Sequence, residues 1–124
     1  MAMKHLAWIA VLMLAAVAPA GCGSGKTSAK VAAEQLQKSF EKADASSREG
    51  VAQAAAAVQS GDYTQAILAM DRVAQTKQVD AAQKEAVGTL ILQTRQAVQQ
   101  DPRLNTPELY QAMSDLITRV HGEN

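Results

Sequence analysis

The sequence predicts an all-α protein, a small bundle of four to five amphipathic helices with short loops that follows an apolar N-terminal segment. Alanine and glutamine are abundant while β-branched residues are thinly scattered, which favours helix over sheet. Apolar residues also recur three and four positions apart through most of residues 29–121. A chain of 124 residues permits one folded domain, which we place at residues 29–124.

The N-terminal segment has the features of a secretory signal peptide. Lys4 supplies a positive charge, and residues 6–18, LAWIAVLMLAAVA, then run without a charged or polar side chain. A stable transmembrane helix needs about 20 apolar residues, so this run is short for a membrane anchor. Pro19 and small residues follow it. We therefore expect residues 1–21 to form a signal peptide.

Two cleavage sites compete at the end of this segment. The letters APA at 18–20 fit the small-x-small rule and would leave a protein that is secreted, or soluble in the periplasm, after cleavage at Ala20. The letters AGC at 20–22 resemble the end of the lipobox of bacterial lipoproteins, although Pro19 stands where such signals usually carry Leu. The sole cysteine favours lipidation, because an unpaired thiol is a liability in an oxidising compartment and this modification would consume it.

The lipobox resemblance implies that Cys22 is the first mature residue and the site of lipid attachment. Its thiol would carry diacylglycerol, and its amino group an acyl chain such as palmitate. More than one chain makes such an anchor stable. Gly23 in place of Asp implies the outer membrane, with the domain on its periplasmic face. Residues 22–28, rich in glycine and serine, would then form a flexible tether.

The same letters offer a remote alternative, a nucleotide-binding protein. Residues 20–27 fit a relaxed phosphate-loop pattern that ends in Gly-Lys-Thr, and Asp71 follows an apolar run as a metal-binding Asp would. A phosphate loop requires a buried strand before it. The apolar spacing around Asp71 is that of an amphipathic helix, and no segment has the pattern of a strand. This interpretation is therefore disfavoured.

Helical spacing in the folded part begins near Ala29. The stretch ASSREG at 45–50 is open to two interpretations. Ser46 and Glu49 form a capping-box pattern that would start a second helix. A single continuous helix over residues 29–60 fits the apolar spacing equally well.

The later helix boundaries carry clear start and stop signals. Gly61 ends one helix, and Asp62 or Thr64 starts the next. Asp80 with Gln83 forms a cap pair for the following helix. The remaining signals are a stop at Asp101-Pro102, an N-cap at Thr106 before Pro107 in the first helical position, and a stop at Gly122.

Residues 51–75 resemble a tetratricopeptide hairpin. Gly61 and Tyr63 stand at the turn between its two helices, Ala66 lies early in the second helix, and Met70 follows four residues on. The resemblance implies one such hairpin with flanking helices, which would bind protein segments against its inner helices. The alternative is an ordinary helix–helix turn within a bundle.

Composition and motifs leave a non-enzymatic function as the expectation. The chain carries no net charge, so nothing indicates a nucleic-acid partner. No His/Cys/carboxylate cluster has the spacing of a catalytic, cofactor or metal site, and no small-molecule substrate is evident. His121, in the last turn of the last helix, suits the helix C-terminus electrostatically.

We therefore expect a membrane-anchored helical lipoprotein that acts as a protein–protein interaction or scaffold module in the bacterial cell envelope. Tyr63 and Tyr110 are the candidate contacts with another envelope protein, because exposed aromatic residues are enriched at interfaces. Core packing is the alternative for each tyrosine. The alternative function is self-assembly, in which glutamine-rich helices with an alanine seam pair into a dimer or coiled bundle.

Overall fold

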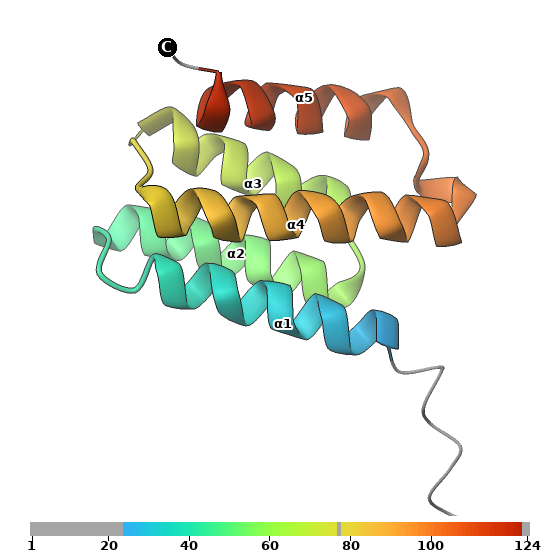
Figure 1. The fold of residues 1–124 in the computed structure, drawn as a ribbon, viewed down its shortest axis with the longest axis horizontal. Coiled ribbons are helices and arrows are strands. Elements are labelled where there is room, and N and C mark those ends of the chain that lie inside the picture. Colours follow the sequence, from blue (N-terminus) through green and yellow to red (C-terminus); the bar gives the residue numbers. More distant parts are fainter. Residues whose placement is uncertain (1–23, 77, 123–124) are drawn as a thin grey trace, which may run out of the picture.

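The computed structural model describes residues 24–76 and 78–122, and over these residues the fold is all-α, as predicted, with no strand (Figure 1). In this part of the chain, five α-helices and one short 3₁₀ helix follow one another. Their bounds are α1 Ser24–Ser39, α2 Ala45–Ser60, α3 Tyr63–Thr76, α4 Ala81–Gln100, η3 Pro102–Leu104 and α5 Pro107–His121.

The first helix begins earlier than the sequence predicted. It starts at Ser24 and not at Ala29, so residues 24–28 of the expected tether are helical. Serine, lysine and threonine are compatible with a helix once tertiary packing holds the turns that follow, and glycine costs only about 1 kcal/mol there.

Residues 29–60 form two helices, because the chain turns between Ser39 and Ala45. The second helix is capped by Asp44, whose carboxylate accepts hydrogen bonds from the backbone N–H of Ser47 at 3.2 Å and from its hydroxyl at 2.8 Å. The expected capping box of Ser46 and Glu49 was therefore wrong. Asp44 begins the helix two residues before Ser46 and satisfies the orphan N–H of Ser47, whereas Ser46 as the cap would have accepted from the N–H of Glu49.

A tight turn joins α2 to α3. Gly61 adopts φ 86°, a left-handed conformation that favours glycine, and its N–H donates to the carbonyls that end α2. Asp62 then accepts from the N–H of Gln65 at 3.2 Å and starts α3, as predicted. Within this hairpin a Cβ placed on Gly50 would lie 2.7 Å from a Val73 methyl group. Glycine at position 50 therefore lets α2 and α3 approach closely.

The predicted signals also define the last two long helices. Asp80 and Gln83 form a reciprocal capping box at the start of α4. The hydroxyl of Thr106 accepts from the N–H of Leu109 at 3.1 Å, and Pro107 takes the first position of α5. Gly122 donates its N–H to Thr118 and ends the helix.

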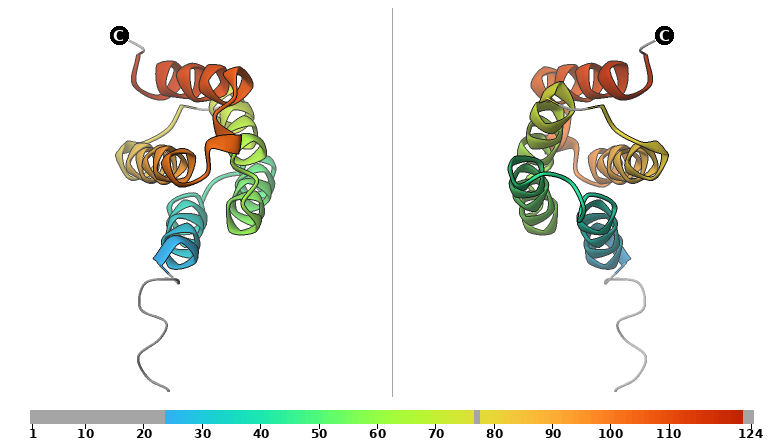
Figure 2. Two further views of the ribbon diagram at one scale, coloured as in Figure 1. Left: turned by 90° about the vertical axis from the view of Figure 1, so that its right-hand side faces the viewer. Right: turned by 90° about the vertical axis from the view of Figure 1, so that its left-hand side faces the viewer.

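The helices pack as a bundle in which α1 and α5 occupy opposite edges (Figure 2). Helix α2 packs against α1 and α3, and α3 in turn packs against α5. Helix α4 returns to α1 and lies on the other side of the bundle from α2 and α3. The core between them is aliphatic, and its largest fully buried side chains include Leu36, Ile67, Met70, Leu90, Leu109 and Leu116. Burial of this surface supplies the main stabilisation.

Candidate functional site

The tyrosines that the sequence singled out occupy different environments. Tyr63 is only 7% exposed and belongs to the core, where its hydroxyl lies 3.3 Å from the Nε2 donor of Gln93 on α4. It therefore joins α3 to α4, and the alternative of core packing describes it. A ring buried in this way does not offer the surface contact that we expected of Tyr63. Cys22, the expected lipid attachment site, lies outside the described residues.

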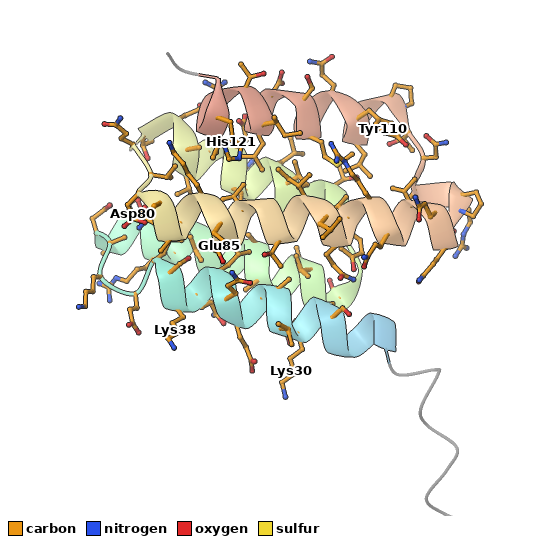
Figure 3. The ribbon with its side chains drawn as sticks, in the orientation of Figure 1. Lys30, Lys38, Asp80, Glu85, Tyr110 and His121 are labelled. Carbon is orange, nitrogen blue, oxygen red and sulfur yellow. The ribbon has the colours of Figure 1, made fainter. Side chains whose placement is uncertain are left out.

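Tyr110 is 48% exposed on α5, so its ring is open to a partner. Helical spacing places the half-buried Ile117 and the exposed His121 on the same flank of the helix, seven and eleven residues further on. Figure 3 shows Tyr110 and His121 toward the two ends of α5. We call Tyr110, Ile117 and His121 the α5 strip. It combines one aromatic ring, one aliphatic side chain and one imidazole.

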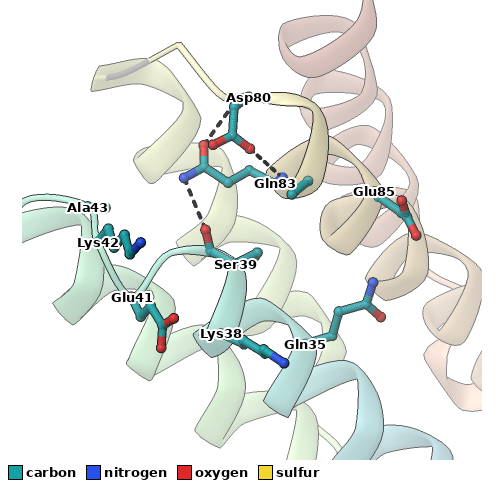
Figure 4. Close-up of a pocket in the computed structure, with 10 residues that line it drawn as sticks. Gln35, Lys38, Ser39, Glu41, Lys42, Ala43, Asp80, Gln83 and Glu85 are labelled. Carbon is teal, nitrogen blue, oxygen red and sulfur yellow. Dashed lines mark hydrogen bonds between the residues drawn. The ribbon is translucent and has the colours of Figure 1, made fainter.

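A hollow lies where the end of α1 meets the start of α4 (Figure 4). It is open to solvent and has a volume of about 530 Å3. Most of the residues that line it are polar, and the charged ones are of both signs. The residues that form it are Gln35, Lys38, Ser39, Glu41, Lys42, Ala43, Asp80, Ala82, Gln83 and Glu85.

Gln83, which lines this hollow, forms hydrogen bonds with residues on both sides of it. Gln83 accepts from the N–H of Asp80 through Oε1 at 2.9 Å and donates from Nε2 to the carbonyl of Ser39 at 3.2 Å. The same glutamine therefore caps α4 and ties it to the end of α1. The sequence predicted the cap, because both partners are local. It could not predict the second bond, whose partners are 44 residues apart.

Asp71, the residue that the phosphate-loop alternative would assign to a metal, has a structural role in α3. It is 9% exposed, and its Oδ1 accepts from Nε of Arg119 on α5 at 2.7 Å. Its Oδ2 accepts from Gln75, one turn along the same helix. The prediction that Asp71 belongs to an amphipathic helix is confirmed, and its carboxylate holds α3 to α5.

The described side chains are equipped for hydrogen bonding and ion pairing. Within residues 24–76 and 78–122, no three His, Cys, Asp or Glu residues lie close enough together to hold a metal ion. Every buried side-chain nitrogen or oxygen in this part of the chain has a hydrogen-bond partner. The hydrogen bonds from Arg103 in η3 hold the pKa of Asp101, the N-cap of η3, below its ordinary value. Arg103 is exposed and Asp101 is partly exposed.

Comparison of the chain with known protein families, with curated proteins and with solved structures found no match. Among the helices of the described part, none is both long and apolar enough to cross a membrane. The candidate surface therefore rests on the geometry of this chain, with Tyr110 as its most exposed aromatic residue in that part.

Proposed function

We propose that this protein is a lipid-anchored, non-enzymatic helical protein of the bacterial cell envelope, which binds another envelope protein. The observation that carries the proposal is the position of the only cysteine in the sequence. Cys22 follows an apolar run and two small residues, and a helical bundle begins two positions later at Ser24. That order is typical of an exported domain held by its processed N-terminus. The expected location is the periplasmic face of the outer membrane.

The α5 strip is the proposed contact with the partner. A half-exposed tyrosine loses little conformational entropy on binding and buries a large area, which is why tyrosine is enriched among residues that dominate binding energy. Ile117 lies two turns further along the same flank of α5, and the part of it that does not pack against the core adds apolar surface for a partner to cover. His121 and the carboxamide of Gln111 on α5 supply hydrogen-bonding groups at its margin.

Self-assembly through an alanine seam receives less support from the packing. Many alanines of the described helices are buried within the bundle and fill the spaces between its own helices. The most completely buried are Ala32, Ala33, Ala54, Ala55, Ala66 and Ala86. A second copy would have to pack on surfaces other than these.

The anchor is tested by cell fractionation of a Cys22→Ser variant, with Ser24→Ala as the matched control that keeps the thiol. The wild type and Ser24→Ala should remain with the membranes after washing with high salt or alkali. Cys22→Ser should appear in the soluble fraction, because one substitution removes the attachment atom. A wild type that is soluble, or a Cys22→Ser protein that stays on the membrane, would contradict the proposal.

The contact surface is tested by placing a photo-crosslinking amino acid at position 110, with position 92 as the control. Leu92 on α4 is 56% exposed, so its accessibility matches that of Tyr110. Irradiation of living cells should give one discrete adduct with another envelope protein from position 110 and none from position 92. An adduct of two copies of this chain would favour self-assembly instead. Absence of any adduct at position 110 would contradict the assigned surface.

A further inference from the structure

We propose that the outer face of α1 lies on the anionic lipid surface into which the acyl chains of Cys22 insert. We define this α1 face by Lys30, Val31, Glu34 and Lys38. The inference rests on the proposed lipid anchor and adds an orientation to it. It follows from the length of chain before the first helix, from the exposure of α1 and from the distribution of charge.

The chain between the anchor and the bundle is very short. Cys22 lies two residues before Ser24, the first residue of α1. Consecutive Cα atoms are about 3.8 Å apart, so the Cα atoms of these residues lie within about 8 Å of each other in any conformation. An acylated Cys22 at the level of the lipid headgroups therefore holds the first turn of α1 close to them.

Helix α1 is an edge helix with one free side. Its other side packs against α2 and α4 through the buried residues Ala29, Ala32, Ala33, Leu36 and Phe40. Lys30 and Lys38 project from α1 away from the other helices (Figure 3). Val31, which is 52% exposed, lies on the same free side. A half-exposed valine between lysines can rest at the lipid interface while the ammonium groups reach the phosphates.

Positive and negative charges are unevenly distributed along the sequence, in the way that this orientation requires. Residues 24–42 carry an excess of two positive charges, from Lys26, Lys30, Lys38 and Lys42 against Glu34 and Glu41. Residues 43–124 hold seven basic and ten acidic residues, so the rest of the domain is net negative. An anionic surface attracts the first segment and repels the second. Because the anchor makes this contact intramolecular, a weak attraction suffices to populate it.

The orientation also places the α5 strip where a partner can reach it. Helices α1 and α5 occupy opposite edges of the bundle (Figure 2). With α1 on the lipid, helix α5, which carries the strip, lies at the edge of the bundle farthest from the bilayer.

The test uses the full mature lipoprotein, reconstituted in vesicles of phosphatidylcholine with phosphatidylglycerol and a headgroup spin-labelled lipid. Single cysteines replace Val31, Gln111 and Gln99, and each carries a fluorophore. Gln111 is exposed on α5, and Gln99 is exposed at the C-terminal end of α4, which lies at the same end of the bundle as Ser24 (Figure 1). The label at position 31 should be quenched most strongly. Stronger quenching at position 99 would mean an end-on orientation, and equal quenching at all three would mean no preferred orientation. Either result overturns the proposal.

A second measurement tests whether electrostatic attraction keeps the α1 face on the lipid surface. The double variant Lys30→Gln with Lys38→Gln should lower the ratio of the lipid-contacting to the free orientation by roughly tenfold. Its matched control is Lys84→Gln with Arg95→Gln, which removes the same charge from exposed positions of α4 and should leave quenching at position 31 unchanged. High salt or vesicles of phosphatidylcholine alone should mimic the α1 double variant. If quenching at position 31 changes neither in the α1 double variant nor at high salt, the electrostatic contact is contradicted.

Failure of the anchor and failure of the orientation give different readouts. The thiol-reactive fluorophore is first applied to the denatured wild type, whose only cysteine is Cys22. Labelling of the denatured wild type would mean that the Cys22 thiol is free. That result would contradict both the lipid anchor and this inference. If the wild type resists labelling but the three cysteine variants are quenched equally, the anchor stands and only the orientation is contradicted.

Discussion

The two edge helices of the bundle, α1 and α5, bury similar aliphatic faces and expose opposite chemistry. Leu36 on α1 and Leu116 on α5 are both 0% exposed. The free side of α1 carries two lysines and one glutamate around Val31, whereas α5 exposes Tyr110 on one flank and Glu108 and Asp115 on the other. The buried residues therefore explain why the two helices belong to one fold. The exposed ones explain why we assign one edge to lipid and the other to protein.

The largest loss of stability is expected when a buried leucine is removed from either edge helix. Leu36→Ala and Leu116→Ala should each lower the free energy of unfolding by about 2–5 kcal/mol, because each deletes fully buried methyl groups and leaves a cavity. Urea unfolding of the signal-free protein, followed by far-UV circular dichroism, measures both. Val31→Ala is the surface control and should change stability little. If only one leucine mattered, the edges would not share one core.

The attachment of α5 to the bundle depends in part on its ion pair with α3. Arg119→Met should cost about 1–2 kcal/mol, because it leaves the largely buried Asp71 without its charged donor. The matched control is Arg103→Met, which removes an Arg–Asp pair that is exposed and should not measurably change the unfolding midpoint. Equal effects of the two substitutions would show that burial does not strengthen the α3–α5 pair.

The N-cap of α5 should make a smaller contribution to stability. Thr106→Ala should lower stability by about 1 kcal/mol, because the N–H of Leu109 loses its acceptor. Thr118→Ala, an exposed threonine within the same helix, is the control for the change of residue type. Hydrogen exchange should also accelerate in the first turn of α5 in the first variant alone. Unchanged exchange there would mean that the first turn does not depend on Thr106.

The smallest effect is expected in η3, which leads into α5. Asp101 should titrate below its ordinary pKa of 3.8, because Arg103 donates hydrogen bonds to its carboxylate. Since the folded pKa is lowered, the stabilisation is present above the ordinary pKa and is lost as the pH falls through the lowered value. The carboxyl carbon shift of Asp101 measures this by NMR. Arg103→Gln should raise the pH at the midpoint of the Asp101 titration, whereas Arg95→Gln should leave that midpoint unchanged.

Local signals in the sequence predicted most of the helix boundaries correctly. Gly61, the pair of Asp80 and Gln83, and Thr106 with Pro107 each act within a few residues, so their geometry is encoded in adjacent letters. The boundary at Asp44 was missed because Ser46 and Glu49 supply an equally good local pattern. Local sequence alone did not choose between the two caps.

Nonlocal features were beyond the reach of the sequence. The return of α4 to α1, and with it the hollow near Gln83, depends on which helix faces pair across the bundle. Helical periodicity identifies an apolar face but not its neighbour. Tyr63 illustrates the limit, because the sequence left both a partner contact and core packing open for it, and its partner Gln93 lies 30 residues away. Tyr110 was predicted as a contact and is exposed, and its role stays a prediction.

Intact mass spectrometry of the native protein extracted from membranes tests the claim that Cys22 attaches this bundle to a membrane. We expect a chain that begins at Cys22 and carries the added mass of diacylglycerol, with or without an acyl chain on its amino group. Lipase or mild base should remove ester-linked acyl chains and shift the mass accordingly. A chain that begins at Gly21 or Met1 with an unmodified thiol would contradict the claim.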